Sequence, residues 1–89
     1  MKTRQVEQTL AVKLGFEQRD SHHRIYRLYL DGQLVARTFV SHGQRELDAF
    51  LIGQMARQMR LSRQEFLDAV ACPLDRDGYY ALLRQRLAP

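Results

Sequence analysis

The sequence predicts a single α+β domain over residues 1–89. A three-stranded antiparallel sheet should pack on helices in the order α-β-β-β-α, followed by extra C-terminal helices. A length of 89 residues allows one domain with a thin core. The hydrophobic fraction of 45% and the charged fraction of 27% are typical of a folded globular protein. Apolar residues recur at helical spacing toward both ends, whereas the middle is rich in residues that favour strands.

A short helix is predicted over residues 4–14, with Thr3 as its cap and Gly15 as its left-handed end. Its apolar side chains recur every fourth residue, at Val6, Leu10 and Leu14. This spacing places them on one stripe, which we expect to face the core.

Three strands are predicted next, over residues 16–19, 23–30 and 34–40. The second and third flank Asp31-Gly32, a strong signal for a two-residue hairpin turn. With that turn, residues whose numbers sum to about 63 should face each other across the hairpin. Neither alternate set of side chains in residues 23–30 is purely apolar. We therefore expect helices on one side of the hairpin and water on part of the other.

Three helices are predicted after the sheet, over residues 45–60, 63–71 and 76–87. The first carries an apolar stripe that we expect in the core: Leu47, Phe50, Leu51, Met55 and Met59. Ser62-Arg63-Gln64-Glu65 fits a capping box, and Asp75 can cap the last helix. The last helix either covers the thin core or serves as a dimer or partner surface, and we favour the core. The sequence leaves open whether the protein dimerises.

Composition excludes several classes of function. The single cysteine, Cys72, permits no intrachain disulfide, and we expect it to be buried beside Pro73. No apolar run is long enough for a membrane helix, and the first residues lack a signal-peptide core, which predicts a cytoplasmic protein. There is no glycine-rich phosphate loop and no GxSxG motif. An ATPase, a dinucleotide-binding enzyme and a serine hydrolase are therefore unsupported.

The net charge of +4 is distributed unevenly. Residues 1–45 carry eight Lys and Arg against four acids, whereas residues 46–89 carry six Arg against six acids. A basic front half predicts one positive face, suited to phosphate or to an acidic partner, although a merely solvated basic surface is the alternative.

The densest polar cluster surrounds His22 and His23. Adjacent histidines on an extended segment point to opposite faces, so they are poorly placed to share one metal, and we expect no metal or cofactor. A histidine beside Arg24 and Arg27 could instead act as a general acid or base on RNA, whose 2′-hydroxyl is a built-in nucleophile. The alternative is a structural or merely exposed histidine.

The third histidine, His42, follows the last predicted strand. The register from Asp31-Gly32 places it near Ser21 and His22, at the end of the sheet where the other histidines lie. A bulge in the hairpin would shift this register.

Over roughly residues 4–70, the sequence motifs and their order resemble those of the HicA family of bacterial and archaeal toxins. The matching segments are Leu14-Gly15-Phe16-Glu17, Ser21-His22-His23 with Ile25-Tyr26, Asp31-Gly32, and Ser41-His42-Gly43 followed by the helix of residues 46–59 and Leu61-Ser62-Arg63-Gln64-Glu65-Phe66. Residues 72–89 extend beyond the resemblance. Asp20 stands where the family usually has Gly, and Ser41 where it usually has Arg. Both changes lower the positive charge at the site.

The resemblance implies a fold like that of double-stranded-RNA-binding domains. It also implies a metal-independent endoribonuclease that cuts mRNA, with His23 or His22 as the catalytic residue, inhibited by a HicB-type antitoxin protein. The RNA contacts that we expect are Ser21, Arg24, Arg27, Arg37 and His42. The alternative is a non-catalytic RNA-binding or protein-interaction module with the same fold.

Overall fold

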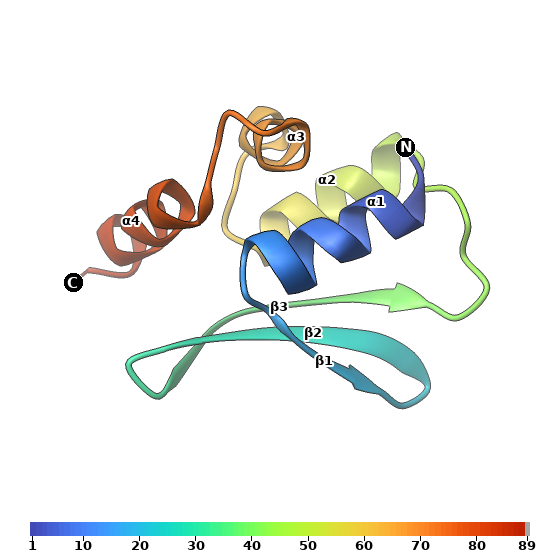
Figure 1. Ribbon diagram of the computed structural model, residues 1–89, viewed down its shortest axis with the longest axis horizontal. Coiled ribbons are helices and arrows are strands. Elements are labelled where there is room, and N and C mark those ends of the chain that lie inside the picture. Colours follow the sequence, from blue (N-terminus) through green and yellow to red (C-terminus); the bar gives the residue numbers. More distant parts are fainter. Residues whose placement is uncertain (89) are drawn as a thin grey trace.

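A computed structural model describes residues 1–88, with every helix on the same side of a three-stranded sheet (Figure 1). The elements in chain order are α1 (Thr3–Gln8), a π-helical segment (Thr9–Lys13), β1 (Glu17–Asp20), β2 (His23–Leu30), β3 (Gln33–Ser41), α2 (Ala49–Gln58), α3 (Arg63–Ala71) and α4 (Arg76–Leu87). The sheet is antiparallel in the order β1-β2-β3. The predicted α+β class is confirmed, and the closer likeness to a double-stranded-RNA-binding domain stays a prediction.

The β2–β3 turn forms as its sequence predicts. Asp31 and Gly32 both have positive φ, 53° and 78°, as a two-residue turn between twisted strands requires. Pairs next to the turn sum to 63, such as Leu30 with Gln33. A bulge between Leu28 and Tyr29 shifts the remaining pairs to a sum of 64. The predicted register therefore holds to within one residue.

The two faces of β2 differ as predicted. Tyr26 and Leu28 are buried under the helices, whereas His23 and Tyr29 on the other face are exposed. The core lies between the covered face and the helices, and its largest buried side chains are Tyr26, Tyr79, Phe66, Leu10, Leu14, Leu28, Met59, Leu83, Val6 and Thr38.

The first helix departs from its prediction in two ways. It begins at Thr3, which is only 2% exposed and lies inside the helix, so Thr3 is not its cap. Lys2 is the N-cap residue, and its side chain makes no capping bond. The helix also widens to a π-helix from Thr9. Gly15 ends the segment with φ 79°, as predicted, and a Cβ there would meet the Tyr80 hydroxyl at 2.8 Å.

The second helix begins later than predicted, at Ala49 instead of residue 45, because Asp48 caps it by accepting a bond from Leu51 N at 2.8 Å. The residues before it pair with the chain's start instead. Thr3 N donates to Arg45 O at 3.0 Å, and Leu47 N donates to Met1 O at 2.8 Å.

Phe50 does not belong to the core stripe predicted for this helix. It is 75% exposed, whereas Met55 and Met59 are buried. Phe50 precedes Met55 by five residues, which at 3.6 residues per turn places it about 140° around the helix. The core prediction was therefore wrong for Phe50.

The last two helices begin where the sequence predicts, and α4 belongs to the core. Tyr79 and Leu83 are 0% exposed. Cys72, however, is exposed, so its predicted burial was wrong. It ends α3 as a left-handed C-cap residue with φ 101°.

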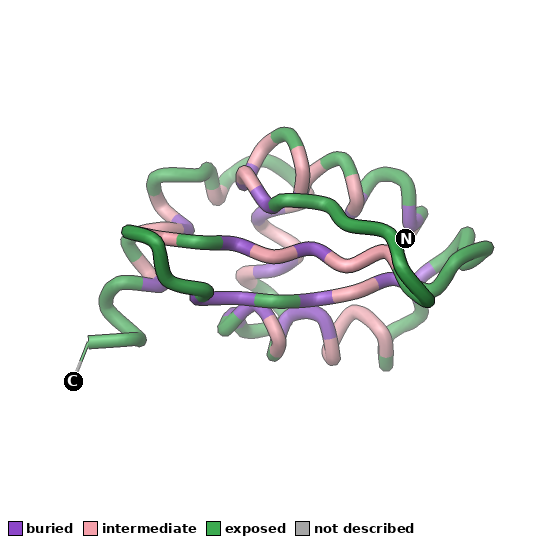
Figure 2. The backbone as a smooth tube through the Cα atoms, turned by 90° about the horizontal axis from the view of Figure 1, so that it is seen from below, coloured by how far each residue is buried: buried purple, intermediate pink, exposed green. Residues whose placement is uncertain are grey.

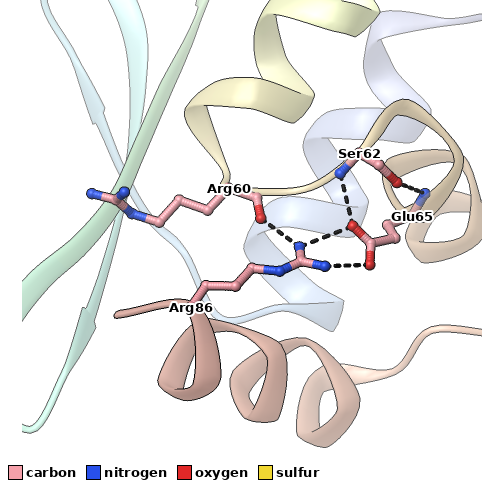
Figure 3. A network of polar contacts seen from close by, with 4 residues as sticks. All are labelled: Arg60, Ser62, Glu65 and Arg86. Carbon is pink, nitrogen blue, oxygen red and sulfur yellow. Dashed lines mark hydrogen bonds and ion pairs between the residues drawn. The ribbon is translucent and has the colours of Figure 1, made fainter. Parts of the chain in front are cut away.

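A polar network ties α4 to the start of α3 (Figure 3). The Arg86 guanidinium donates to both carboxylate oxygens of Glu65, at 2.9 and 2.6 Å, and to the carbonyl of Arg60 at 2.6 Å. Glu65 also accepts from Ser62 N at 2.7 Å, which completes the predicted capping box. These donors lower the pKa of Glu65 to about 2, with the Arg86 bond as the largest cause.

Candidate nucleic-acid interface

The face of the sheet turned away from the helices, here called the open face, is a broad surface (Figure 2). Strand alternation and the register place on it Glu17 and Arg19 of β1, His23, Ile25, Arg27 and Tyr29 of β2, and Leu34, Arg37, Phe39 and Ser41 of β3. Tyr29 and Leu34 are 42% and 50% exposed. The open face therefore mixes arginines with aromatic and apolar side chains.

Arg27 and Arg37 face each other across the β2–β3 ladder. Directly opposed residues have Cβ atoms about 4.5–5.5 Å apart, where like charges repel. Glu17 lies opposite Arg27 on the other side, yet no ion pair within residues 1–88 involves Arg19, Arg27 or Arg37. The Nε of Arg27 is also buried without a hydrogen-bond partner among the described residues. An anion bound between the two guanidinium groups would relieve this repulsion.

Phe39 follows Arg37 on the same face of β3, and its ring contacts the His23 ring, with ring centroids 5.1 Å apart and planes at 37°. Both side chains are on the open face, where no helix covers them. Exposed aromatic rings on a sheet can stack on nucleic-acid bases. The His23–Phe39 pair and the arginines thus offer a base contact next to a phosphate contact.

The loops at one end of the sheet bring His42 to the β1–β2 turn. His42 Nε2 lies 3.0 Å from the carbonyl oxygen of Ser21, the residue before His22. A carbonyl only accepts, so Nε2 carries the hydrogen, and Nδ1 of the neutral ring is left as an acceptor. The predicted juxtaposition of His42 with Ser21 is confirmed, despite the bulge. An imidazole oriented through one nitrogen is an arrangement suited to proton transfer through the other.

Arg24 is not brought to the open face. It follows His23 in the strand and therefore points to the opposite side, where its Nη1 lies 3.2 Å from Glu7 of α1. Glu7 also accepts from the Tyr26 hydroxyl. The hydrogen bond from Arg24 to Glu7 and the negative charge of Glu7 raise the pKa of Arg24. Burial, followed by the hydrogen bond to Glu7, raises the pKa of Tyr26. The structure thus engages Arg24 in a contact between sheet and helix.

A second basic surface was not predicted. A shallow groove beside the His42 loop is lined by Lys2, Thr3, Arg4, Glu7, Arg24, Gly43, Gln44, Arg45 and Glu46. It forms because the chain's start pairs with the segment before α2, through the Lys2–Glu46 bridge. The cations are visible in the sequence, but no local pattern indicates that residues so far apart meet.

Two further properties concern the described residues alone. No group of three or more His, Cys, Asp or Glu side chains within residues 1–88 is placed to hold a metal ion. None of the helices in this part of the chain has the length and apolar character to cross a membrane.

Comparison with known proteins identifies no family: no family model matches the chain, and no curated protein or solved structure matches it. The resemblance to HicA toxins stays a prediction from the sequence motifs.

Proposed function

We propose that this protein binds RNA across the open face of its sheet. The observation that carries the proposal is the opposed pair Arg27 and Arg37, which make no ion pair among residues 1–88 and lie next to Phe39 of the His23–Phe39 ring pair. Phosphates would bind the guanidinium groups, and unpaired bases would stack on the rings. Such binding weakens with salt, because each phosphate contact releases counterions.

The histidines at the end of the sheet support a second step, cleavage without a metal. A histidine base would take the proton of a 2′-hydroxyl, and that oxygen would attack the adjacent phosphorus. The 5′-oxygen would leave with a proton from a histidine acid, and a 2′,3′-cyclic phosphate would remain. The candidates are His23 and His22, with His42 assisting through Nδ1. The oriented ring of His42 is the observation that favours this step.

The resemblance to HicA toxins supports the same activity, in the cytoplasm, with a HicB-type antitoxin as partner. Arg24 is a weaker candidate for phosphate than the sequence suggested, because Glu7 already neutralises it. A non-catalytic RNA-binding module, or a protein-interaction module, is the alternative.

The test is incubation of the purified protein with labelled mixed-sequence RNA in EDTA. Beside the wild type we would assay the double variant His22→Ala, His23→Ala, the single variant His42→Ala, and Arg27→Gln with Arg37→Gln. Arg57→Gln, an exposed arginine on α2, is the matched control for loss of charge.

Cleavage by wild type that is lost in the double histidine variant would support the nuclease. Salt-sensitive binding without cleavage, weakened by Arg27→Gln with Arg37→Gln and unaffected by Arg57→Gln, would support the binding module alone. RNA binding that is unchanged in the open-face variants would refute the proposed surface.

A further inference from the structure

The outer edge of β3 is an unpaired sheet edge. β3 pairs with β2 on one side only. At the two ends of this edge, backbone carbonyls already accept hydrogen bonds from the chain itself. Arg60 Nε donates to Val35 O at 3.0 Å, and Gln44 N donates to Ser41 O at 3.1 Å. Between these ends, over residues 36–40, no backbone bond joins the outer edge to another described element. This edge is a template for an added strand.

A groove between this edge and α2 has two adjoining hollows. The first has apolar walls from Val40, Leu51 and Met55, with Gln54 at its side. The second lies along Ala36, Arg37 and Arg60. Gln58 lines both hollows, and its side chain is fixed to β3 because its Oε1 accepts a hydrogen bond from the Thr38 hydroxyl at 2.7 Å. The two hollows therefore meet at Gln58, beside the middle of the unpaired edge.

The charges of the groove select its occupant. Arg37 and Arg60 line it, and no carboxylate does among the described residues. A second copy of this chain, paired through its own β3, would add two more arginines and no carboxylate to the junction. Like charges at a junction disfavour that pairing. An acidic segment would be attracted by the same charges.

We propose that the β3 edge binds an extended acidic peptide segment of another protein, which adds to the sheet as a fourth strand. Its backbone would pair over residues 36–40, which accommodates about five residues of an extended chain. Because strand side chains alternate, every second residue would enter the groove beside α2 and should be apolar. The residue between them would lie opposite Arg37 and should be Asp or Glu.

The probe is a labelled, end-blocked peptide with alternating Glu and Val, compared with the same peptide carrying Lys in place of Glu. We expect only the acidic peptide to bind wild type. In nuclear magnetic resonance spectra, it should slow the hydrogen exchange of the Arg37 and Phe39 amides. Arg37→Glu should lower the affinity for the acidic peptide by about tenfold or more and raise the affinity for the Lys peptide. Arg57→Glu on α2 should change neither affinity.

Gln54→Trp separates this site from the proposed RNA surface. The indole would fill the apolar hollow and abolish peptide binding, with RNA binding across the open face left unchanged. Any of three results would overturn the proposal. The protein binds the two peptides equally or binds neither, the protection from exchange is confined to other strands, or the peptide-free protein sediments as a dimer joined at β3.

Discussion

Replacing Glu65 by Gln tests whether the Glu65–Arg86 ion pair holds α4 against α3 and stabilises the fold in a pH-dependent way. The amide keeps the shape and can still accept from Ser62, but it removes the charge that Arg86 binds. We therefore expect the loss of stability in Glu65→Gln to depend on pH, which loss of packing alone would not do.

The magnitude follows from the pKa of Glu65, which falls from 4.5 to about 2 on folding. One pKa unit corresponds to about 1.4 kcal/mol, so the shift sets an upper value of about 3.4 kcal/mol. The Glu65 and Arg86 side chains remain 26% and 36% exposed, and solvent screening reduces this to about 1–2 kcal/mol. Domains of this kind have unfolding free energies of about 5–15 kcal/mol, so the effect is measurable.

The sign follows from the direction of the shift. A carboxyl whose folded pKa is lowered stabilises the fold fully above its unfolded pKa and loses that contribution as pH falls through the folded pKa. The difference between wild type and Glu65→Gln should be constant above pH about 5, and it should shrink toward zero between pH about 4.5 and 2.

Urea unfolding at pH 7, 5, 4, 3 and 2 is the assay, with Glu17→Gln on β1 as the control for an exposed carboxylate without an ion pair among the described residues. A Glu65→Gln deficit of the same size at every pH would refute the reasoning, and so would an equal deficit in Glu17→Gln.

Three further outcomes are expected. Tyr79→Phe should cost about 1–3 kcal/mol in urea unfolding, because it leaves the buried carbonyl of Met59 without the hydroxyl that donates to it at 3.0 Å. A cost near zero would mean that another donor replaces it. Gly15→Ala should cost about 1–2 kcal/mol or more, because φ is 79° there and the new Cβ meets the Tyr80 hydroxyl. A variant as stable as wild type would contradict that strain. Arg27→Ala should weaken RNA binding and reduce the salt slope by about one, whereas an unchanged slope would remove Arg27 from the phosphate contacts.

Much of the fold could be predicted because its signals act over a few residues. Asp31-Gly32 adopts the positive φ that the hairpin needs, and Ser62 with Glu65 closes the capping box within one helical turn. The approach of His42 to Ser21 also followed from one turn, because antiparallel pairing carries a register along both strands. Such local chemistry leaves few alternatives.

The candidate site was only partly predictable. Arg27 and Arg37 share the open face through strand alternation, but the sequence does not state which face the helices cover. Arg24 lies on the covered side, where Glu7 of α1 binds it. That pairing depends on how α1 crosses the sheet, which no pattern within either element specifies.

The sequence by itself determined the order of helices and strands, the starts of α3 and α4, where the chain turns and which alternate side chains share a face, because these depend on neighbouring residues. Tertiary structure alone decided which of these side chains are exposed and which distant segments contact each other. It exposed Phe50 and Cys72, joined residues 1–3 to the segment before α2, and left the β3 edge open beside that helix. The physical reason is that these outcomes depend on packing between segments far apart in the chain, and such packing selects one partner among many that local patterns allow.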